Sequence, residues 1–207
     1  MMAQFIYVAD PMCSWCWAFR SVTEKLKERH PDLKWQYIMG GLAPDSDLPM
    51  PEKMQQGIQS IWHQIEETTG TQFNYEFWSQ NTPRRSTYPS CRAVITAEEI
   101  APGSADKMIT AIQKAYYLNA QNPSDLSTLT ALAESLDIDS TLFSEQIRSA
   151  EVEQKLQQHL NFAQQLGAQG FPSLYLRINE QVVPLALGYT QINKIEERLE
   201  NILEGIS

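Results

Sequence analysis

The sequence predicts a mixed α/β fold in which a long helical segment interrupts a small sheet. Three observations support this: strand-like segments occur at both ends of the chain, helical periodicity fills the middle, and a β-α-β unit comes first. The expected order of elements is βαβ, then an all-α-helical insertion, then ββα. We expect residues 1–45 and 168–207 to form one domain and residues 46–167 to form the inserted helical domain.

The opening unit begins with a strand at residues 4–9, where Phe, Ile, Tyr and Val dominate. A helix should follow over about residues 13–29, because its apolar side chains recur at steps of three or four. The next strand is residues 33–39. A strand, a helix and a second strand of one sheet form a right-handed crossover, so the two strands should be parallel.

The remaining elements follow from the same patterns. Between residues 51 and 167 the apolar spacing indicates six helices, and residues 71–90 are expected to be a loop. Residues 173–178 and 182–187 predict a β-hairpin. Pro184 lacks an N–H group and therefore places the second of these strands at a sheet edge. An amphipathic helix completes the order.

Composition excludes several classes of protein. The 207 residues are 43% hydrophobic, and no segment approaches the roughly 18 apolar residues of a membrane span. The net charge of -9 should repel nucleic acid and anionic lipid. The first residues have neither the basic nor the long apolar region of a signal peptide, so we expect a cytoplasmic protein without membrane or nucleic-acid partners.

A cysteine pair opens the first predicted helix, in Cys13-Ser14-Trp15-Cys16. Residues at i and i+3 lie on one side of a helix, so the two sulfurs can reach each other. Unpaired N–H groups and the positive dipole end of a helix favour a thiolate. In such motifs the pKa of the first cysteine falls from about 8.5 to roughly 3.5–7.5. We therefore expect Cys13 to attack a substrate disulfide and Cys16 to resolve the mixed disulfide.

Other interpretations of the pair stay open from the residues alone. It could be a structural disulfide, two inert buried thiols, or part of a zinc site. A zinc site takes about four ligands, and neither Cys91 nor any of the three histidines stands in ligand spacing. The position favours redox chemistry, because a C-x-x-C that begins the helix of a βαβ unit is a specific signal. We expect no metal and no resident cofactor.

A second motif, Gly170-Phe171-Pro172-Ser173, follows a helix and enters a strand. A proline here indicates a rigid turn in which a cis bond can occur. Phe171 should be extended, and its backbone groups could pair with an extended peptide substrate. The alternative is a proline that merely starts a strand.

Together, the segment Asp10-Pro11-Met12-Cys13-Ser14-Trp15-Cys16-Trp17, the helical insertion and the Phe171-Pro172 motif resemble the DsbA-like branch of the thioredoxin superfamily, and more narrowly its cytoplasmic members. The resemblance implies a thioredoxin fold split by a helical domain. It also implies a thiol-disulfide oxidoreductase of reductase or isomerase type. In that reading Cys13 is the nucleophile, Cys16 the resolving thiol and Pro172 a cis-proline that faces them.

The chain departs from the secreted oxidases of this branch at two places. Ser14-Trp15 stands where those proteins often carry Pro-His, so strong oxidant behaviour is not expected. Phe171 is larger than the usual Val or Thr and should narrow the substrate groove. Trp15 and Trp17 cannot share one helical face, so at least one should be partly exposed. We expect Trp15, Phe171 and Pro172 to contact substrate.

Two further hypotheses remain. The chain is also similar to the kappa-class glutathione transferases and hydroxychromene-carboxylate isomerases, which bind glutathione beside the same proline. They typically carry serine in place of Cys13, so a glutathione-dependent transferase or isomerase is the second hypothesis. The third is a binding or adaptor protein whose cysteines do not cycle. The expected partners are protein or small-molecule disulfides, with glutathione or a thioredoxin-type protein as a candidate electron donor.

The segment from Thr82 to Arg92 is unusual in an acidic chain, because it contains three arginines, Arg84, Arg85 and Arg92. They could pair with a substrate carboxylate, such as that of glutathione, or belong to a solvated loop and a helix start. Cys91 is either an idle buried thiol or a regulatory one.

Overall fold

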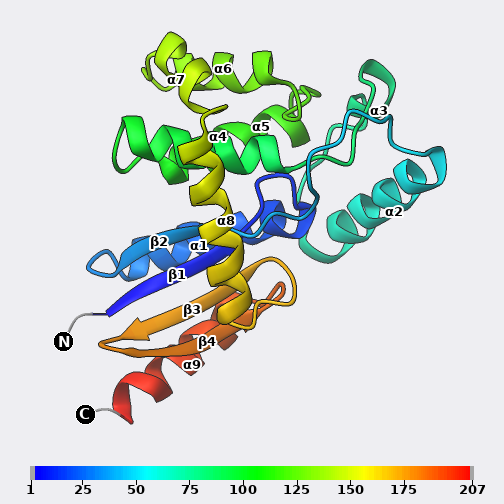
Figure 1. The fold of residues 1–207 in the computed structure, drawn as a ribbon. Helices are drawn as coiled ribbons and strands as arrows, with labels where there is room; N and C mark the ends of the chain where they lie inside the picture. The colour runs from blue at the N-terminus through cyan, green and yellow to red at the C-terminus, as the bar shows by residue number, and fades with distance from the viewer. Residues whose placement is uncertain (1–2, 206–207) are drawn as a thin grey trace.

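The structure is a computed structural model that describes residues 3–205. In this part of the chain, four strands form one sheet and nine helices accompany it (Figure 1). The strands are β1 (Ala3–Ala9), β2 (Lys34–Met39), β3 (Ser173–Ile178) and β4 (Gln181–Leu187). The helices are α1 (Ser14–Arg29), α2 (Glu52–Thr69), α3 (Phe77–Gln80), α4 (Tyr88–Ile100), α5 (Ala105–Tyr117), α6 (Leu126–Ser135), α7 (Ser140–Gln146), α8 (Ala150–Gln165) and α9 (Ile192–Glu204). The predicted order βαβ, helical insertion, ββα is confirmed.

The sheet has the strand order β2-β1-β3-β4. As predicted, β1 and β2 are parallel and β3 and β4 form an antiparallel hairpin. Strand β4 lies at the edge, where the missing N–H group of Pro184 costs little. The register of the antiparallel β1–β3 pair places Val8 opposite Ser173. The segment that leaves β1 therefore lies beside the segment that enters β3.

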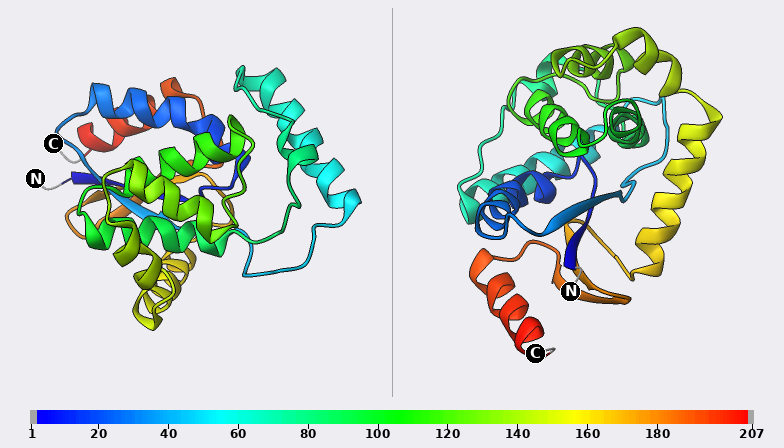
Figure 2. Two further views of the ribbon diagram at one scale, coloured as in Figure 1. Left: turned by 90° about the horizontal axis from the view of Figure 1, so that it is seen from above. Right: turned by 90° about the vertical axis from the view of Figure 1, so that its left-hand side faces the viewer.

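Helices cover both faces of the sheet. On one face, α1 and α9 pack Phe19, Leu26 and Leu199 against the strands. On the opposite face, Ala163 of α8 joins a cluster with Tyr175 of β3. The two views of Figure 2 show this layering, with α1 and α9 together and α8 apart from them.

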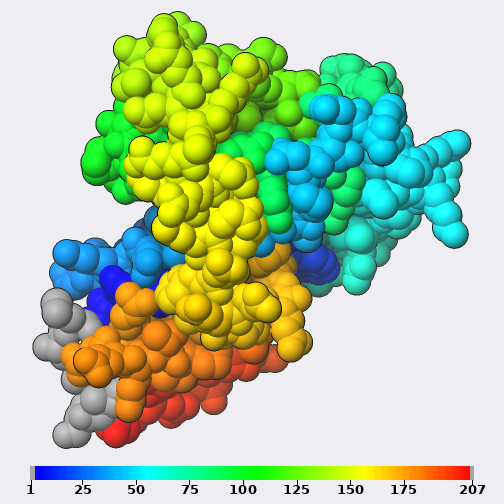
Figure 3. Space-filling model, in the orientation of Figure 1, coloured from blue at the N-terminus to red at the C-terminus, as the bar shows by residue number. Residues whose placement is uncertain are grey.

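The inserted helices have a core of their own. Helices α4 to α8 bury a cluster that includes Ile112, Leu129, Phe143 and Leu156. Met39 at the end of β2 belongs to the same cluster, so this core reaches the sheet. Helix α8 runs from the helical layer down across the sheet, as Figure 3 shows. The division of the chain at residues 46 and 168 remains a prediction.

A second helical cluster is aromatic and lies between α2, α3 and α5. Trp62 of α2 is fully buried and has ring contacts with several neighbours, among them Phe73, Phe77 and Tyr117. Met12, next to Cys13, belongs to this cluster. The cluster therefore connects the start of α1 with the inserted helices.

The prediction of a loop over residues 71–90 was wrong at two places. The single turn α3 lies within this range, and α4 begins at Tyr88. One helical turn is too short to show an apolar period. Pro89 suggested a loop, but proline is tolerated in the first turn of a helix, where its missing N–H group has no intrahelical partner. Within residues 3–205, no helix is both long and apolar enough to span a bilayer.

Candidate active site

Cys13 lies where the loop after β1 becomes helix α1. It is the N-cap residue of α1, and its backbone N–H donates to the carbonyl of Asp10 at 3.0 Å. Within residues 3–205 its side chain makes no capping hydrogen bond to the first turn of α1, and its carbonyl accepts from Trp17 N–H at 3.1 Å. Cys13 is 9% exposed, whereas Cys16 is fully buried. Access is thus restricted to the first cysteine, and both cysteines are free thiols.

The Phe171-Pro172 motif faces this cysteine. The peptide bond between the two residues is cis. The Sγ atom of Cys13 lies 3.6 Å from the carbonyl oxygen of Phe171 and, as a thiol, donates to it. The β1–β3 register explains the approach, because it joins two segments 158 residues apart in the sequence. The structure therefore brings Cys13, Cys16, Phe171 and Pro172 together, while their catalytic and binding roles remain predictions.

The two thiols differ in proton affinity. The hydrogen bond from Cys16 and the backbone N–H groups of Cys16 and Trp15 lower the pKa of Cys13, although burial and the charge of Asp10 oppose them. Burial raises the pKa of Cys16 well above its ordinary value, and the hydrogen bond and charge of Cys13 add to this effect. Cys13 therefore loses its proton more readily than Cys16.

A tyrosine that the sequence analysis missed lies beside the buried thiol. Tyr7 of β1 is 4% exposed, and its hydroxyl is hydrogen bonded to Cys16. Burial and the charges of both cysteines raise the pKa of Tyr7 well above its ordinary value. Tyr7 is thus a neutral donor to the sulfur of the buried cysteine. A tyrosine in a strand of Phe, Ile and Val gave no signal beyond burial.

Asp10 is a second residue of the site to which the sequence assigns no role. Its carboxylate is fully buried and accepts from Met12 N–H at 2.8 Å, Leu42 N–H at 2.7 Å and the Thr87 hydroxyl at 2.6 Å. The Cys91 thiol is a fourth donor at 3.5 Å. Burial raises the pKa of Asp10, and the four donors counteract this. Asp10 therefore ties the loop before Cys13 to the start of α4.

On the other side of Phe171 lies a hollow of about 430 Å³. It is lined mainly by Gln169, Gly170, Phe171, Ser173, Leu187 and Gly188, and none of its lining residues is charged. The ring of Phe171 is held against Gly40, where a Cβ atom would come within 2.1 Å of it. Gly40 therefore makes room for the large residue that precedes the cis-proline.

The two tryptophans of α1 lie on different faces of the helix, as their spacing predicts, and contact different neighbours. Trp15 is half-buried, with its ring 5.6 Å from that of Tyr189. Trp17 is also half-buried, and it stacks on Tyr117 with ring centroids 5.7 Å apart. The buried hydroxyl of Tyr117 has no hydrogen-bond partner among the described residues. Its pKa is raised by burial and by charges that include those of Cys13 and Cys16.

The arginines of the 82–92 segment separate into two kinds. Arg84 pairs with Asp125 at 2.5 Å, and Arg92 pairs with Asp45 at 2.5 Å and with Glu153 at 3.1 Å. Arg85 has no such pair in the described residues, although its positive charge acts to lower the pKa of Tyr116. Cys91 is fully buried, and burial raises its pKa well above the ordinary value.

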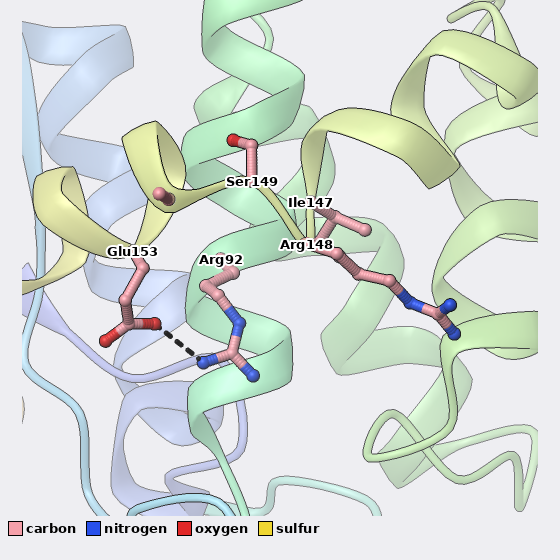
Figure 4. A pocket seen from close by; sticks show the side chains of 6 residues that line it. Arg92, Ile147, Arg148, Ser149 and Glu153 are labelled. Atoms are coloured by element: carbon pink, nitrogen blue, oxygen red, sulfur yellow. Dashed lines mark hydrogen bonds and ion pairs between the residues drawn. The ribbon is translucent and has the colours of Figure 1, made fainter.

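A second hollow, of about 420 Å³, lies where α8 begins. Figure 4 shows Arg92 turned toward Glu153, while Arg148 extends away from both. Of the two arginines that line this hollow, Arg92 is therefore neutralised by carboxylates of the protein. Among residues 3–205, no group of three or more His, Cys, Asp and Glu side chains is arranged to hold a metal ion.

Comparison with known proteins places this geometry in a family. Residues 5–200 match the model of the DSBA-like thioredoxin domain. A candidate protein disulfide isomerase from Nitrosomonas europaea has 27% sequence identity and a TM-score of 0.90, with both chains fully covered. The cytosolic disulfide reductase DsbM from Pseudomonas aeruginosa has 22% identity and a TM-score of 0.79 over 97% of this chain and 98% of its own. DsbM has also been solved with GSH.

A curated relative carries a different description. The chain is 23% identical over 145 residues to the ClpXP adapter protein SpxH of Halalkalibacterium halodurans. The match covers 68% of this chain and 47% of that protein. The chain thus spans about half the length of this relative.

Proposed function

The chain belongs to the family of DSBA-like thioredoxin domains, and from this premise we propose that it is a dithiol-disulfide oxidoreductase of reductase or isomerase type. The observation that carries the proposal is the pair Cys13 and Cys16 at the start of α1, with Cys13 facing the carbonyl of Phe171. Their pKa values shift in opposite directions, which suits a nucleophile and a resolving thiol.

The proposed reaction has two steps. The thiolate of Cys13 attacks one sulfur of the substrate disulfide, forms a mixed disulfide and releases the other sulfur as a thiolate. Cys16 then loses its proton to solvent and attacks the sulfur of Cys13, which releases the second substrate thiolate. Two electrons pass from the dithiol to the substrate, and a Cys13–Cys16 disulfide remains.

Substrate contacts in this proposal come from both sides of Cys13. The cis-Pro172 turn presents the backbone of Phe171, and the uncharged hollow beyond it accepts the substrate's apolar part. Trp15 offers a partly exposed ring on the helix. Oxidised protein returns to the dithiol with a cellular reductant. The DsbM structure with GSH favours glutathione in that role, and DsbM's description as cytosolic favours a reducing, cytoplasmic setting.

The test uses the reduced protein and a chromogenic or fluorescent disulfide. Cys13→Ser should abolish reduction, and Cys16→Ser should accumulate a mixed disulfide that mass spectrometry detects. Cys91→Ser is the matched control, because it removes the third thiol and keeps a donor for Asp10. Equal activity of Cys13→Ser and the parent would exclude the proposal. A redox titration of the pair gives the direction: about -270 mV indicates a reductase and about -120 mV an oxidant.

A second candidate is an adaptor, favoured by the likeness to SpxH. In that case the groove beside Pro172 would hold a partner protein, and the cysteines would not need to cycle. Binding of a partner that survives Cys13→Ser, together with a pair that stays reduced at every biological potential, would favour the adaptor. A glutathione-dependent transferase or isomerase would instead retain turnover in Cys16→Ser.

A further inference from the structure

Arg85 differs from the other basic residues that are partly buried. Arg20, Lys27, Arg84, Arg92 and Lys155 each have an ion pair with Asp or Glu, and Arg177 has a hydrogen bond to Gln36. Arg85 is also half-buried, yet within residues 3–205 it has neither an ion pair nor a hydrogen bond. A guanidinium that has lost part of its water gains most from an anionic acceptor.

The segment that carries Arg85 lies against the residues before Cys13. The carbonyl of Ser86, the next residue, accepts from the Ser124 hydroxyl at 2.7 Å. That hydroxyl also lies 3.9 Å from the Sδ atom of Met12. One residue further, Thr87 donates to Asp10. The two residues that follow Arg85 are therefore held next to the loop that presents Cys13.

The aromatic cluster gives a second link between Arg85 and this loop. Tyr116 and Met12 belong to the same buried cluster. Burial raises the pKa of Tyr116, whereas the positive charge of Arg85 lowers it and the charge of Asp10 raises it. The charges of Arg85 and Asp10 thus shift the pKa of the same hydroxyl, which belongs to a residue in the cluster of Met12.

The hollow beside Phe171 does not supply a positive charge. The residues that line this hollow are uncharged, so it offers no partner to an acidic substrate. The whole protein has a net charge of -9 and would repel such a substrate. An unpaired cation two residues before Thr87, which donates to Asp10, would reverse that repulsion locally.

We propose that Arg85 binds a carboxylate of the substrate, and that the enzyme therefore prefers small disulfides that bear an acidic group near the sulfur. This inference rests on the proposed oxidoreductase function. A guanidinium can hold a carboxylate with two parallel hydrogen bonds, which orients the disulfide as well as attracting it. Arg84 and Arg92, which pair with Asp125 and Asp45, are not available for this role.

The experiment compares two chromogenic disulfides in single turnover with the reduced protein. One is 5,5′-dithiobis(2-nitrobenzoic acid), with a carboxylate on each ring, and the other is 4,4′-dithiodipyridine, which is neutral at pH 7.5. In both cases Cys13 and Cys16 supply the two electrons, and two equivalents of the reduced probe are released, as the aryl thiolate from the first disulfide and as neutral 4-thiopyridone from the second. For Arg85→Gln, we expect the ratio of the acidic to the neutral rate constant to fall about tenfold. Arg85→Lys should retain part of the preference.

The matched control is Arg148→Gln, which removes the same charge from an exposed arginine near the start of α8. It should leave the ratio unchanged. An unchanged ratio in Arg85→Gln, or an equal fall in both variants, would overturn the assignment of Arg85. Failure of the parent protein to react with either disulfide would instead overturn the proposed function. Thermal unfolding of each variant separates these results from a loss of folded protein.

Discussion

At the residue scale, the site combines two thiols with two buried polar groups. Cys13 has a lowered pKa and is slightly exposed, whereas Cys16 has a raised pKa and is fully buried. Tyr7 donates to the enclosed sulfur, while the charge of Asp10 raises the pKa of both cysteines. Asp10 therefore limits how acidic Cys13 becomes, and its hydrogen bonds hold the loop that positions Cys13.

We predict that Asp10→Asn has two effects. The pKa of Cys13 should fall, because a negative charge that raises it is removed. The asparagine side chain would also place its NH2 group against N–H and O–H groups that now donate to the Asp10 carboxylate. The free energy of unfolding should therefore fall by about 1–3 kcal/mol. The pH dependence of Cys13 alkylation by iodoacetamide measures the first effect and urea unfolding the second.

The control for this change is Asp47→Asn, an exposed position outside the site. It removes the same charge, and we expect both measurements to match those of the parent. An alkylation midpoint that moves to higher pH in Asp10→Asn would contradict the prediction.

The sequence supported the cysteine pair and the proline but not Asp10 or Tyr7. The first two stand in motifs of fixed local spacing. Asp10 directly follows the predicted strand of residues 4–9, and its carboxylate accepts from Thr87 and Cys91 at the start of α4, 77 and 81 residues away in the sequence. A contact of that kind leaves no local pattern. The same limit applies to Arg85, whose lack of a partner is visible only beside its paired neighbours.

At the scale of elements, the end of β2 shapes the turn that enters β3. Gly40 follows β2, and its N–H donates to the carbonyl of Ala9 at 2.8 Å. The ring of Phe171 occupies the space that a side chain on Gly40 would need. The position of Phe171, and with it the carbonyl that faces Cys13, therefore depends on a glycine in another element.

We predict that Gly40→Ala slows disulfide exchange and that the main effect of the substitution is on this rate rather than on the free energy of unfolding. The new methyl group would come within 2.1 Å of the Phe171 ring, so the ring must move, and we expect the carbonyl beside Cys13 to move with it. A displacement of about 1 Å at a reacting group can cost up to about a hundredfold in rate, and we expect a loss of at least about tenfold. Single-turnover reduction of 4,4′-dithiodipyridine measures it.

Gly57→Ala provides the matched control. Gly57 lies inside α2, and a Cβ atom there would have nothing within 4 Å. Alanine should stabilise the helix by up to about 1 kcal/mol and leave the exchange rate unchanged. A normal rate in Gly40→Ala would show that the position of Phe171 does not control Cys13.

Strands and long helices could be predicted well from their periods, but the short turn α3 could not. Helix α1 was expected over about residues 13–29 and spans Ser14–Arg29. Its apolar face is regular because it packs continuously against the sheet. Helix α3 has only four residues, of which Phe77 alone is buried. Its conformation is set by the aromatic cluster around Trp62 rather than by its own sequence.

At the scale of the whole molecule, α8 joins two cores. Val152 and Leu156 in its first half belong to the helical core. Ala163 in its second half belongs to the cluster on the sheet. Between them, the Nδ1 atom of His159 accepts from Met39 N–H of β2 at 3.1 Å. A helix that contributes to both cores should prevent either from unfolding alone.

We therefore predict a single unfolding transition and test it with Leu156→Ala. Leu156 is fully buried in the helical core, so its truncation should cost about 2–5 kcal/mol. Far-ultraviolet circular dichroism follows all helices, while alkylation of Cys16 reports opening of the sheet layer, where this thiol is buried. If α8 couples the cores, the unfolding midpoints followed by the two probes should fall by the same amount in Leu156→Ala. Leu48→Ala, at an exposed position, should change neither midpoint. A shift confined to circular dichroism would mean that the helical insertion unfolds as an independent unit.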